Sequence, residues 1–531
     1  MYLPIQRYYS QEFSIPNGFV GDLGDFQTPT NLTDKICQYL SSIGINPKVL
    51  IEPTCGKGNF VLSAIKYFPS IRYIYCVELQ EKYEWLFKLN IAKQLFTTNF
   101  AKEIEFHRDN IFFHKLSAKL INYINDHSPE ILILGNPPWV TSSELSILNS
   151  NNIPLKENIK KVRGIEAITG KGNFDIAEYV LLRMLKLFKQ RKAKMAMLCK
   201  TSVVKNIIKA ISDLDLAISN MYSLKINAKK EFNISADATL FVATVGMNIS
   251  YYCKEASFYE EKRKYNRFGW TGNKFASDID TYKEYKEIDG ISPFEWRQGV
   301  KHDVAKIMVL KRNADGILFN GLKEKIDIED DILYPFIKGS GLQKQILRDT
   351  EYKIIITQKS TGEETQYIKE RYPKIWNYLD SHISFFKKRR SIVYKNRPKF
   401  SLFGIGSYAF KPYKIAISGL YKTPNFCLIL PMDNKPVMLD DTSYYISFDD
   451  KEQAIYTWVI LNSEITKKFL SSIVFLDTKR PYTKEILMRI DIREIVKKIK
   501  INGFETKLRE YINFDVNEDG LNRYLNSLPP E

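Results

Sequence analysis

Short apolar runs alternate with longer amphipathic stretches through the first half of this 531-residue chain. The predicted strands are 49–52, 73–78, 104–106, 131–134, 194–199, 222–226 and 239–245, and the predicted helices are 59–67, 80–94 and 176–189. Strands that are separated by helices favour a parallel sheet with helices on both of its faces. The sequence therefore predicts an α/β fold with a doubly wound, mostly parallel sheet.

The character of the sequence changes after this half. Residues 251–290 are rich in charged and aromatic side chains without a clear period, which is typical of a connector. Short β-like runs between turns follow and predict a mixed α+β domain. The predicted organisation is a first domain over 1–250, a connector over 251–290, a second domain over 291–500 and a C-terminal tail over 501–531.

The charge balance indicates a polyanionic partner, because 78 Lys and Arg residues outweigh 61 Asp and Glu residues and leave a net charge of +17. A lysine-rich genome would give the same balance, so the distribution of charge matters more. Residues 381–430 contain ten basic residues and no acidic one. A local excess of this kind favours a surface that contacts phosphates.

Several other classes are disfavoured. The six cysteines include no Cys-x-x-Cys pair and the five histidines no His-x-x-x-His pair, so no metal site is predicted. No apolar run is long enough to span a membrane, and the chain does not open like a signal peptide. We therefore expect a protein inside the cell without a membrane partner.

The stretch "VLIEPTCGKGNF", at 49–60, is a predicted strand that ends in Glu52 and runs through Gly56 and Gly58 into a helix. Glycines at such a turn let a ligand approach the backbone closely. Two more acids, Glu78 and Asp109, follow the next two predicted strands. Each acid alone is more often a surface or capping residue, but three at one sheet edge indicate a ligand site.

The strand at 131–134 leads into Asn136-Pro137-Pro138-Trp139. Two prolines cannot donate to a sheet, so this segment lies beyond the strand with its carbonyls unpaired. In isolation, a segment of this kind is more often a turn that ends a strand and packs its aromatic side chain in the core. Downstream of a ligand-binding glycine turn, it favours a site in which Asn136 and the Pro137 carbonyl accept hydrogen bonds.

Together these motifs resemble the S-adenosylmethionine-dependent amino-methyltransferases of DNA. The segment Glu52-Pro53-x-x-Gly56-x-Gly58-x-Phe60 resembles their motif I, Asn136–Trp139 their catalytic motif IV, "GDFQTP" at 24–29 motif X, and "GNFDIAEYVLLRML" at 172–185 motif V. Their order is that of the gamma class, which methylates adenine at N6. The resemblance covers about residues 20–250 and implies a class I methyltransferase fold, S-adenosyl-L-methionine as the cofactor, and a DNA target-recognition domain over 291–500.

The resemblance also assigns residues to the cofactor. Thr28 and Pro29 would flank its methionine moiety, Glu52 would meet its amino group, Gly56 and Gly58 would form the turn beside it, Glu78 would hold the ribose hydroxyls, and Asp109 would accept from the adenine amino group.

Catalysis would rest on Asn136 and Pro137, whose oxygens would each accept one N–H bond of the target amine and localise its lone pair. Trp139 would stack on an extruded base, and Phe232, in a segment similar to motif VIII, would form a second aromatic wall. Cytosine-C5 methylation uses a nucleophilic cysteine in a Pro-Cys pair, and this chain has none.

The second domain would supply contacts to double-stranded DNA. The candidates are Arg297, Lys301, Arg389, Arg390, Arg397, Lys479 and Arg480. The resemblance leaves open a separately encoded restriction endonuclease or another defence-system partner. It implies a cytoplasmic protein of a prokaryotic cell, associated with the nucleoid when bound to DNA.

Two other functions fit parts of the pattern. The same acceptor motif occurs in methyltransferases that act on an amino or amide nitrogen of RNA or protein, although those chains usually lack a long basic second half. A non-catalytic DNA-binding specificity subunit is the other alternative. Intact Asn136 and Glu52 argue against that alternative.

Overall fold

The computed structural model describes residues 26–97, 102–140, 175–214, 216–498 and 518–529. The chain divides into two compact units, Met1–Ile279 and Asp280–Glu531. None of the helices in the described ranges has both the length and the apolar character needed to cross a bilayer.

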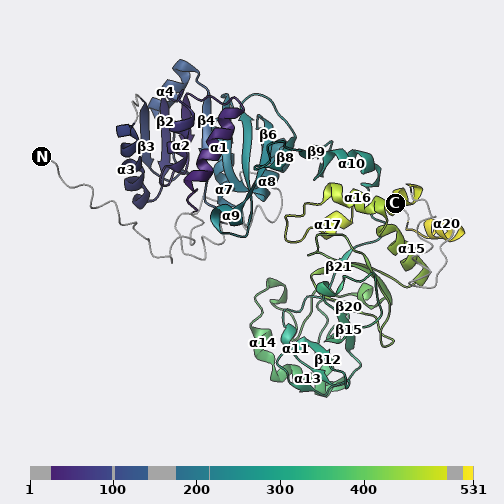
Figure 1. The fold of residues 1–531 in the computed structure, drawn as a ribbon. Helices are drawn as coiled ribbons and strands as arrows, with labels where there is room; N and C mark the ends of the chain where they lie inside the picture. Colours follow the sequence, from purple (N-terminus) through teal and green to yellow (C-terminus); the bar gives the residue numbers. More distant parts are fainter. Residues whose placement is uncertain (1–25, 98–101, 141–174, 215, 499–517, 530–531) are drawn as a thin grey trace. The chain divides into compact units, whose positions relative to one another are not determined.

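The first unit is built on a ten-stranded sheet (Figure 1). In spatial order its strands are β10 (Lys274–Ala276), β9 (Asn266–Thr271), β8 (Tyr252–Ser257), β6 (Ile218–Asn227), β7 (Asp237–Val245), β5 (Ala193–Lys200), β4 (Ile131–Gly135), β1 (Val49–Glu52), β2 (Tyr73–Glu78) and β3 (Glu103–Arg108). Strands β3, β2, β1, β4 and β5 are parallel, and β7 is antiparallel to both of its neighbours. The predicted α/β class is confirmed.

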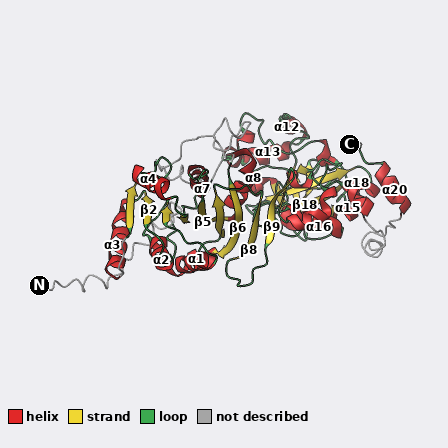
Figure 2. Ribbon diagram, turned by 90° about the horizontal axis from the view of Figure 1, so that it is seen from above, coloured by secondary structure: helices red, strands yellow, loops and turns green. Residues whose placement is uncertain are grey.

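Helices cover both faces of this sheet, with α1 and α2 on one face and α4, α7 and α8 on the other (Figure 2). Their bounds are α1 (Thr30–Ser42), α2 (Asn59–Tyr67), α3 (Glu81–Thr97), α4 (Ala118–His127), α7 (Ile176–Leu187), α8 (Thr201–Leu214) and α9 (Ala228–Phe232). Because both faces are covered, every residue of β1, β2 and β4 is buried. That burial explains why these strands are continuous apolar runs.

The strand order reverses direction between β1 and β4. The chain proceeds from β1 through β2 to β3 on one side, and then returns to place β4 beside β1 on the other. A crevice opens at the carboxyl ends of the strands at such a point, and ligands of open α/β sheets bind there. The glycine turn after β1 and the Asn-Pro-Pro-Trp segment after β4 both lie at this edge.

The prediction of a connector over 251–290 is wrong for most of that range. Strand β8 pairs in parallel with β6, and β9 and β10 extend the same sheet. These strands lack an apolar run because they lie towards the edge, where most of their residues are only partly buried. They make polar contacts instead. Examples are the cation–π contact of Lys254 with the Tyr222 ring and the ion pair of Glu255 with Lys225.

The second unit contains two small sheets. The five-stranded sheet has the order β11 (Arg297–Gln298), β21 (Ser443–Phe448), β18 (Tyr413–Ser418), β19 (Cys427–Ile429) and β16 (Ile346–Leu347). The six-stranded sheet has the order β14 (Lys325–Ile326), β13 (Leu318–Phe319), β12 (Val309–Arg312), β17 (Tyr352–Ile355), β15 (Leu333–Ile337) and β20 (Met438–Leu439). Both sheets are mainly antiparallel.

Short helices surround these sheets and make the unit α+β, as predicted. The α-helices are α10 (Ile279–Tyr285), α11 (Ala305–Met308), α12 (Tyr367–Arg371), α13 (Pro373–Ser381), α14 (Ile383–Lys387), α15 (Lys451–Leu461), α16 (Glu464–Ile473), α17 (Lys484–Leu487), α18 (Ile492–Lys498) and α20 (Glu518–Asn526). The 3-10 turns are η2 (Lys286–Ile288), η3 (Gly339–Gly341), η4 (Ile392–Tyr394) and η5 (Ser407–Phe410).

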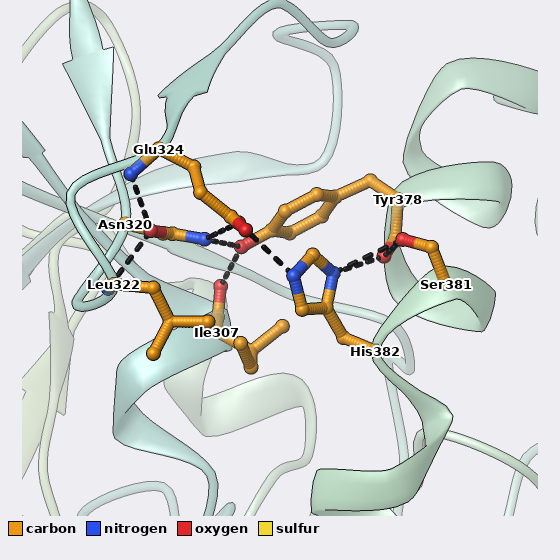
Figure 3. A network of polar contacts seen from close by, with 7 residues as sticks. All are labelled: Ile307, Asn320, Leu322, Glu324, Tyr378, Ser381 and His382. Carbon is orange, nitrogen blue, oxygen red and sulfur yellow. Dashed lines mark hydrogen bonds and ion pairs between the residues drawn. The ribbon is translucent and has the colours of Figure 1, made fainter.

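A polar network fixes α13 and α14 against the six-stranded sheet (Figure 3). The Tyr378 hydroxyl donates to the Ile307 carbonyl at 2.8 Å and accepts from the Asn320 amide at 3.1 Å. The Asn320 amide also donates to Glu324, whose carboxylate lies 3.0 Å from His382 Nε2. Because buried polar groups are stable only when they are paired, this network restricts how the helices can pack on the sheet.

The predicted C-terminal tail is wrong for its described part. Helix α20 packs on α15, with the Tyr524 hydroxyl 2.8 Å from Thr457 Oγ1 and its ring stacked on Tyr456. Tyr524 is buried. Residues 518–529 therefore belong to the second unit, and residues 501–517 lie outside the described ranges.

Candidate active site

A cavity of about 250 Å³ lies at the sheet edge where the strand order reverses. Its walls come from the segment before α1, the turn between β1 and α2, the ends of β2 and β3, the segment after β4, and helix α7. Six of the predicted site residues line it, namely Thr28, Glu52, Gly56, Glu78, Asp109 and Asn136. Pro29, Gly58, Pro137, Trp139 and Phe232 are not among the lining residues.

The turn after β1 depends on its two glycines. Gly56 and Gly58 have φ angles of +50° and +82°. Residues other than glycine adopt such backbone angles only with strain. A Cβ atom at Gly56 would lie 2.5 Å from Gln27 Oε1, and one at Gly58 would lie 2.7 Å from the Phe87 ring. The turn thus brings main chain, rather than side chains, to the wall of the cavity.

Glu52 ends β1 inside the cavity and is 2% exposed. Its Oε2 atom is buried without a hydrogen-bond partner among the described residues. Burial raises the pKa of this carboxyl well above its usual range, with smaller contributions from Cys76 and Glu78. A buried acid with one unpaired oxygen is suited to a ligand that brings a donor or a positive charge.

Glu78 ends β2 and braces the glycine turn from the opposite side. Its Oε2 accepts from the Gly56 N–H at 2.9 Å, and its Oε1 accepts from the Gln80 N–H at 2.8 Å. These bonds tie the end of β2 to the glycine turn and to the start of the next segment. Glu78 therefore has a structural role in the turn that its position in the sequence did not reveal.

Asp109 follows β3 and is held by two bonds. Its Oδ1 accepts from the Asn110 N–H at 2.7 Å, and its Oδ2 lies 2.6 Å from His114 Nδ1. The bond to His114 lowers the pKa of the Asp109 carboxyl. Sequence reasoning missed His114, since no local pattern shows that a residue five positions later turns back onto the acid.

The Asn136 side chain is anchored at one end only. Its Nδ2 donates to the Phe26 carbonyl at 2.9 Å and to Thr28 Oγ1 at 3.2 Å. A backbone carbonyl can only accept, so the nitrogen of the amide, and not its oxygen, must face Phe26. Asn136 Oδ1 is left buried without a partner among the described residues.

Trp139 belongs to an aromatic cluster with Phe26 and Phe232. Its ring centroid is 5.2 Å from that of Phe232 and 6.0 Å from that of Phe26, and the Trp139 side chain is 5% exposed. A base stacked between two rings needs about 7 Å between them, because each stacked contact takes about 3.5 Å. The two predicted aromatic walls therefore contact each other in this structure and leave no gap for a base.

The predicted DNA-contacting residues in the second unit fall into two groups. Arg390, Arg397 and Lys479 are exposed, and no carboxylate of a described residue pairs with them. The others make internal contacts. Arg297 pairs with Glu295, Lys301 lies 2.9 Å from Asp303, Arg480 donates to the Asp441 carbonyl at 3.0 Å, and Arg389 donates to the Ser401 carbonyl at 2.7 Å.

Two basic residues of the stretch at 381–430 are clearly not part of an exposed phosphate-binding surface. The Arg389 guanidinium is partly buried 3.8 Å from the centroid of the Tyr394 ring. Lys414 is 1% exposed in β18, and burial lowers its pKa to about 7. The stretch is free of acids in sequence only, because Lys399 and Lys411 pair in space with Asp380 and Asp449.

The sheet, the glycine turn after β1 and the cavity beside Asn136 define a class I methyltransferase. The chain is 39% identical over 479 residues to the type II methyltransferase M.NspV of Nostoc sp. (strain ATCC 29411 / PCC 7524), a match that covers 90% of this chain and 98% of that protein. This chain therefore belongs to the type II methyltransferases. No family model matches it.

A solved structure with a similar fold is the type IIL restriction-modification enzyme MmeI in complex with DNA. Its TM-score is 0.50 at 12% sequence identity, and the match covers 94% of this chain and 70% of that one. At this identity the likeness shows the fold alone. It extends over both units, since the two together make up the matched length.

Proposed function

We propose that this type II methyltransferase transfers a methyl group from S-adenosyl-L-methionine to the N6 amino group of adenine in duplex DNA. The observation that carries the proposal is the unpaired Asn136 Oδ1, which lies at the wall of the cavity beside the end of β4. An acceptor that the protein buries and does not use is the group that an amine substrate needs.

The residues of the cavity fit the cofactor. Glu52 presents an unpaired carboxyl oxygen to a cationic amino group, and the glycine turn lets main-chain atoms approach a bulky ligand. Glu78 and Asp109 line the same cavity with acceptor oxygens, suited to ribose hydroxyls and to the adenine amino group. Thr28 and Pro29 belong to the segment that would flank the methionine part.

When bound, S-adenosyl-L-methionine supplies an electrophilic methyl group on a sulfonium centre. The task of the protein is to make a weakly nucleophilic nitrogen react. Asn136 Oδ1 and the Pro137 carbonyl each accept one N–H bond of the target amine, which draws its lone pair out of the aromatic ring. Because Nδ2 of Asn136 is already fixed by two partners, Oδ1 is oriented in advance, and little reorganisation accompanies the reaction.

The cysteine that lines the cavity does not suit methylation at a ring carbon. Burial raises the pKa of the Cys55 thiol well above its usual value, followed in size by the effect of Cys76, so the reactive thiolate is not formed near neutral pH. All six cysteines are buried and unbridged. This arrangement supports transfer to an amino nitrogen.

A target base inside a duplex cannot reach a buried acceptor, so the base must be extruded. Trp139 offers the extruded base a face that replaces its lost stacking. Because Trp139 and Phe232 contact each other at 5.2 Å between centroids, entry of the base requires the two rings to separate. We infer that Phe232, on the short helix α9, is the ring that moves, since Trp139 is the more deeply buried of the two.

The second unit would bind DNA through its exposed, unpaired basic residues. The likeness of the whole chain to MmeI, which was solved with DNA, supports this role. A DNA substrate would place the enzyme on the nucleoid in the cytoplasm of a prokaryotic cell. Pairing with a separately encoded restriction endonuclease or another defence-system partner stays a prediction from the resemblance.

The direct test is transfer of a labelled methyl group from the cofactor to duplex DNA, followed by digestion to nucleosides and chromatography. The proposal predicts label in N6-methyldeoxyadenosine. Label in N4-methyl- or 5-methyldeoxycytidine would contradict the assigned base. Parallel reactions with total RNA and with a protein extract address the two alternative acceptors, and transfer to either of them, with none to DNA, would overturn the proposal.

A further inference from the structure

His114 is a buried histidine next to the cavity and does not line it. Its side chain is 6% exposed, whereas that of Asp109 is 50% exposed. The ring bridges two groups, with Nδ1 2.6 Å from Asp109 Oδ2 and Nε2 2.6 Å from the Tyr75 hydroxyl. Arg183 donates to the main-chain carbonyl of His114 and fixes the backbone at this point.

The partners determine where the protons lie. Asp109 has a lowered pKa and is ionised at neutral pH, so it can only accept, and His114 Nδ1 must carry the hydrogen. In a neutral imidazole Nε2 is then the acceptor, and the Tyr75 hydroxyl donates to it. The Tyr75 oxygen in turn accepts from the Ser117 N–H at 3.1 Å. Every group in the chain from Ser117 to Asp109 is thereby satisfied.

This hydrogen-bond relay, which runs from Ser117 through Tyr75 and His114 to Asp109, orients a carboxylate that lines the cavity. Asp109 Oδ1 is held by the Asn110 N–H at 2.7 Å and Oδ2 by His114, so the plane of the carboxylate is fixed from two sides. Half of the Asp109 side chain remains exposed, and the residue lines the cavity. A carboxylate held in this way keeps lone pairs for a donor within the cavity but repels a carbonyl oxygen.

We propose that His114 is a positioning residue that fixes Asp109 as the acceptor for the exocyclic amino group of the cofactor's adenine. The site consequently selects an adenine over a hypoxanthine base in the cofactor. The inference rests on the proposed function, because it takes the adenine end of the cofactor to lie against Asp109. Tyr75 acts one step further back, by fixing the tautomer of His114.

The test uses two substitutions that reproduce different halves of the imidazole. In His114→Asn the side-chain nitrogen can take the place of Nδ1, which preserves the donor to Asp109. In His114→Gln the terminal amide reaches the place of Nε2, which preserves the contact with Tyr75 and removes the donor to Asp109. Both variants replace the ring by an amide, so they are matched in polarity.

Calorimetry of the full chain with S-adenosylhomocysteine and S-inosylhomocysteine gives the readout. We expect the wild type to favour the adenine ligand by about 10- to 100-fold, as for one charge-assisted hydrogen bond. His114→Asn should retain most of this ratio, and His114→Gln should reduce it to less than about threefold. A purely structural role would lower both affinities together and leave the ratio unchanged.

The outcomes separate this inference from the proposed function. If the wild type binds neither ligand, the proposed cofactor and this inference both fail. If the wild type prefers the adenine ligand and His114→Gln keeps the full preference, only the role of His114 fails. Should both His114 variants unfold, as judged by circular dichroism, Tyr75→Phe is measured instead, because it keeps the imidazole. A reduced ratio of the two ligand affinities in Tyr75→Phe supports the relay, and an unchanged ratio overturns it.

Discussion

Among single residues, the amide of Asn136 carries the proposal of an amine substrate. One polar atom of this side chain is bonded to Phe26 and Thr28, and the other is buried without a partner. Leaving a buried acceptor unsatisfied costs about 1–3 kcal/mol, so such an atom calls for an explanation. In the proposed reaction, a substrate that supplies the missing donor recovers this cost at Asn136.

The role of Thr28 in this arrangement is testable. Thr28→Val removes the hydroxyl that accepts from Asn136 Nδ2 and keeps the shape of the side chain. We expect the single-turnover rate at saturating cofactor and DNA to fall about 2- to 10-fold, as for the loss of one neutral hydrogen bond. Thr28→Ser keeps a hydroxyl and should restore most of the rate. A change confined to cofactor affinity would assign Thr28 to the cofactor alone.

The raised pKa of the Glu52 carboxyl leads us to expect that cofactor affinity depends on pH. Burial raises its pKa well above the usual range, so in the ligand-free protein this carboxyl takes up a proton at a higher pH than an exposed carboxyl does. A cationic amino group placed against Glu52 favours the carboxylate, so binding should release up to about one proton, and affinity should fall as the pH falls. Calorimetry in two buffers with different ionisation enthalpies measures this release.

The matched variant for this measurement is Glu52→Gln, which keeps the size of the side chain and cannot titrate. Its binding enthalpy should not depend on the buffer beyond what other groups contribute. A wild-type enthalpy that is the same in both buffers would mean that Glu52 does not meet the amino group.

At the scale of elements, the strands β8 to β10 determine where the first unit ends. They cover the edge of β6, and the Trp270 indole N–H donates to the Ile208 carbonyl at 3.0 Å. A fragment of residues 1–279 should therefore unfold cooperatively and bind the cofactor. A fragment of residues 1–250 exposes the edge of β6 and should aggregate or unfold at a lower temperature.

Thermal unfolding and light scattering of the two fragments decide this point. Equal stability and solubility would show that the last strands contribute little. Neither fragment should bind duplex DNA with the affinity of the full chain, because both lack the second unit.

The elements differ, for physical reasons, in how closely their sequence predicts them. Strands β1, β2 and β4 are buried on both faces and were predicted nearly to the residue, since burial leaves continuous apolar runs. Strands β8 and β9 are only partly buried and carry polar side chains, so their sequence does not differ from that of a connector. Helices α1, α4 and α8 were not predicted, and α8 follows β5 without an intervening loop.

The site was predictable only where a motif lies within a short segment. Glu52, Gly56 and Asn136 were identified from local patterns, and the structure places them around one cavity. The relay from Tyr75 through His114 joins residues 39 positions apart, and no local sequence pattern predicts it. The same limit applies to Arg389, whose partners Tyr394 and Ser401 could not be known from an acid-free run of sequence.

In the whole molecule, the proposed function divides chemistry and DNA binding between the two units. The exposed basic residues of the second unit that lack an ion pair with any described residue include Lys387, Lys388, Arg390 and Lys395. Replacing these four by Gln should weaken DNA binding for all sequences and reduce the salt dependence by up to about 0.9 in slope per lost phosphate contact. Sequence preference should change little, because phosphate contacts do not read bases.

A control with the same change in charge uses four lysines that are paired with carboxylates, Lys374, Lys399, Lys411 and Lys484. Their replacement by Gln should alter the salt slope less, since these groups are already neutralised within the protein. Equal effects of the two quadruple variants would show that net charge alone matters, and that the DNA-binding surface lies elsewhere.

The central claim is that Asn136 activates the amino group of an adenine in DNA. The most direct measurement is sequencing that detects N6-methyladenine in DNA from cells that express the full chain or its Asn136→Ala variant. We predict modified adenines at one recurring sequence with the wild type and a loss of at least about 100-fold with the variant, because an oriented acceptor of this kind contributes about 2.7–4 kcal/mol. Unmodified adenines with the wild type, or equal modification with the variant, would contradict the account.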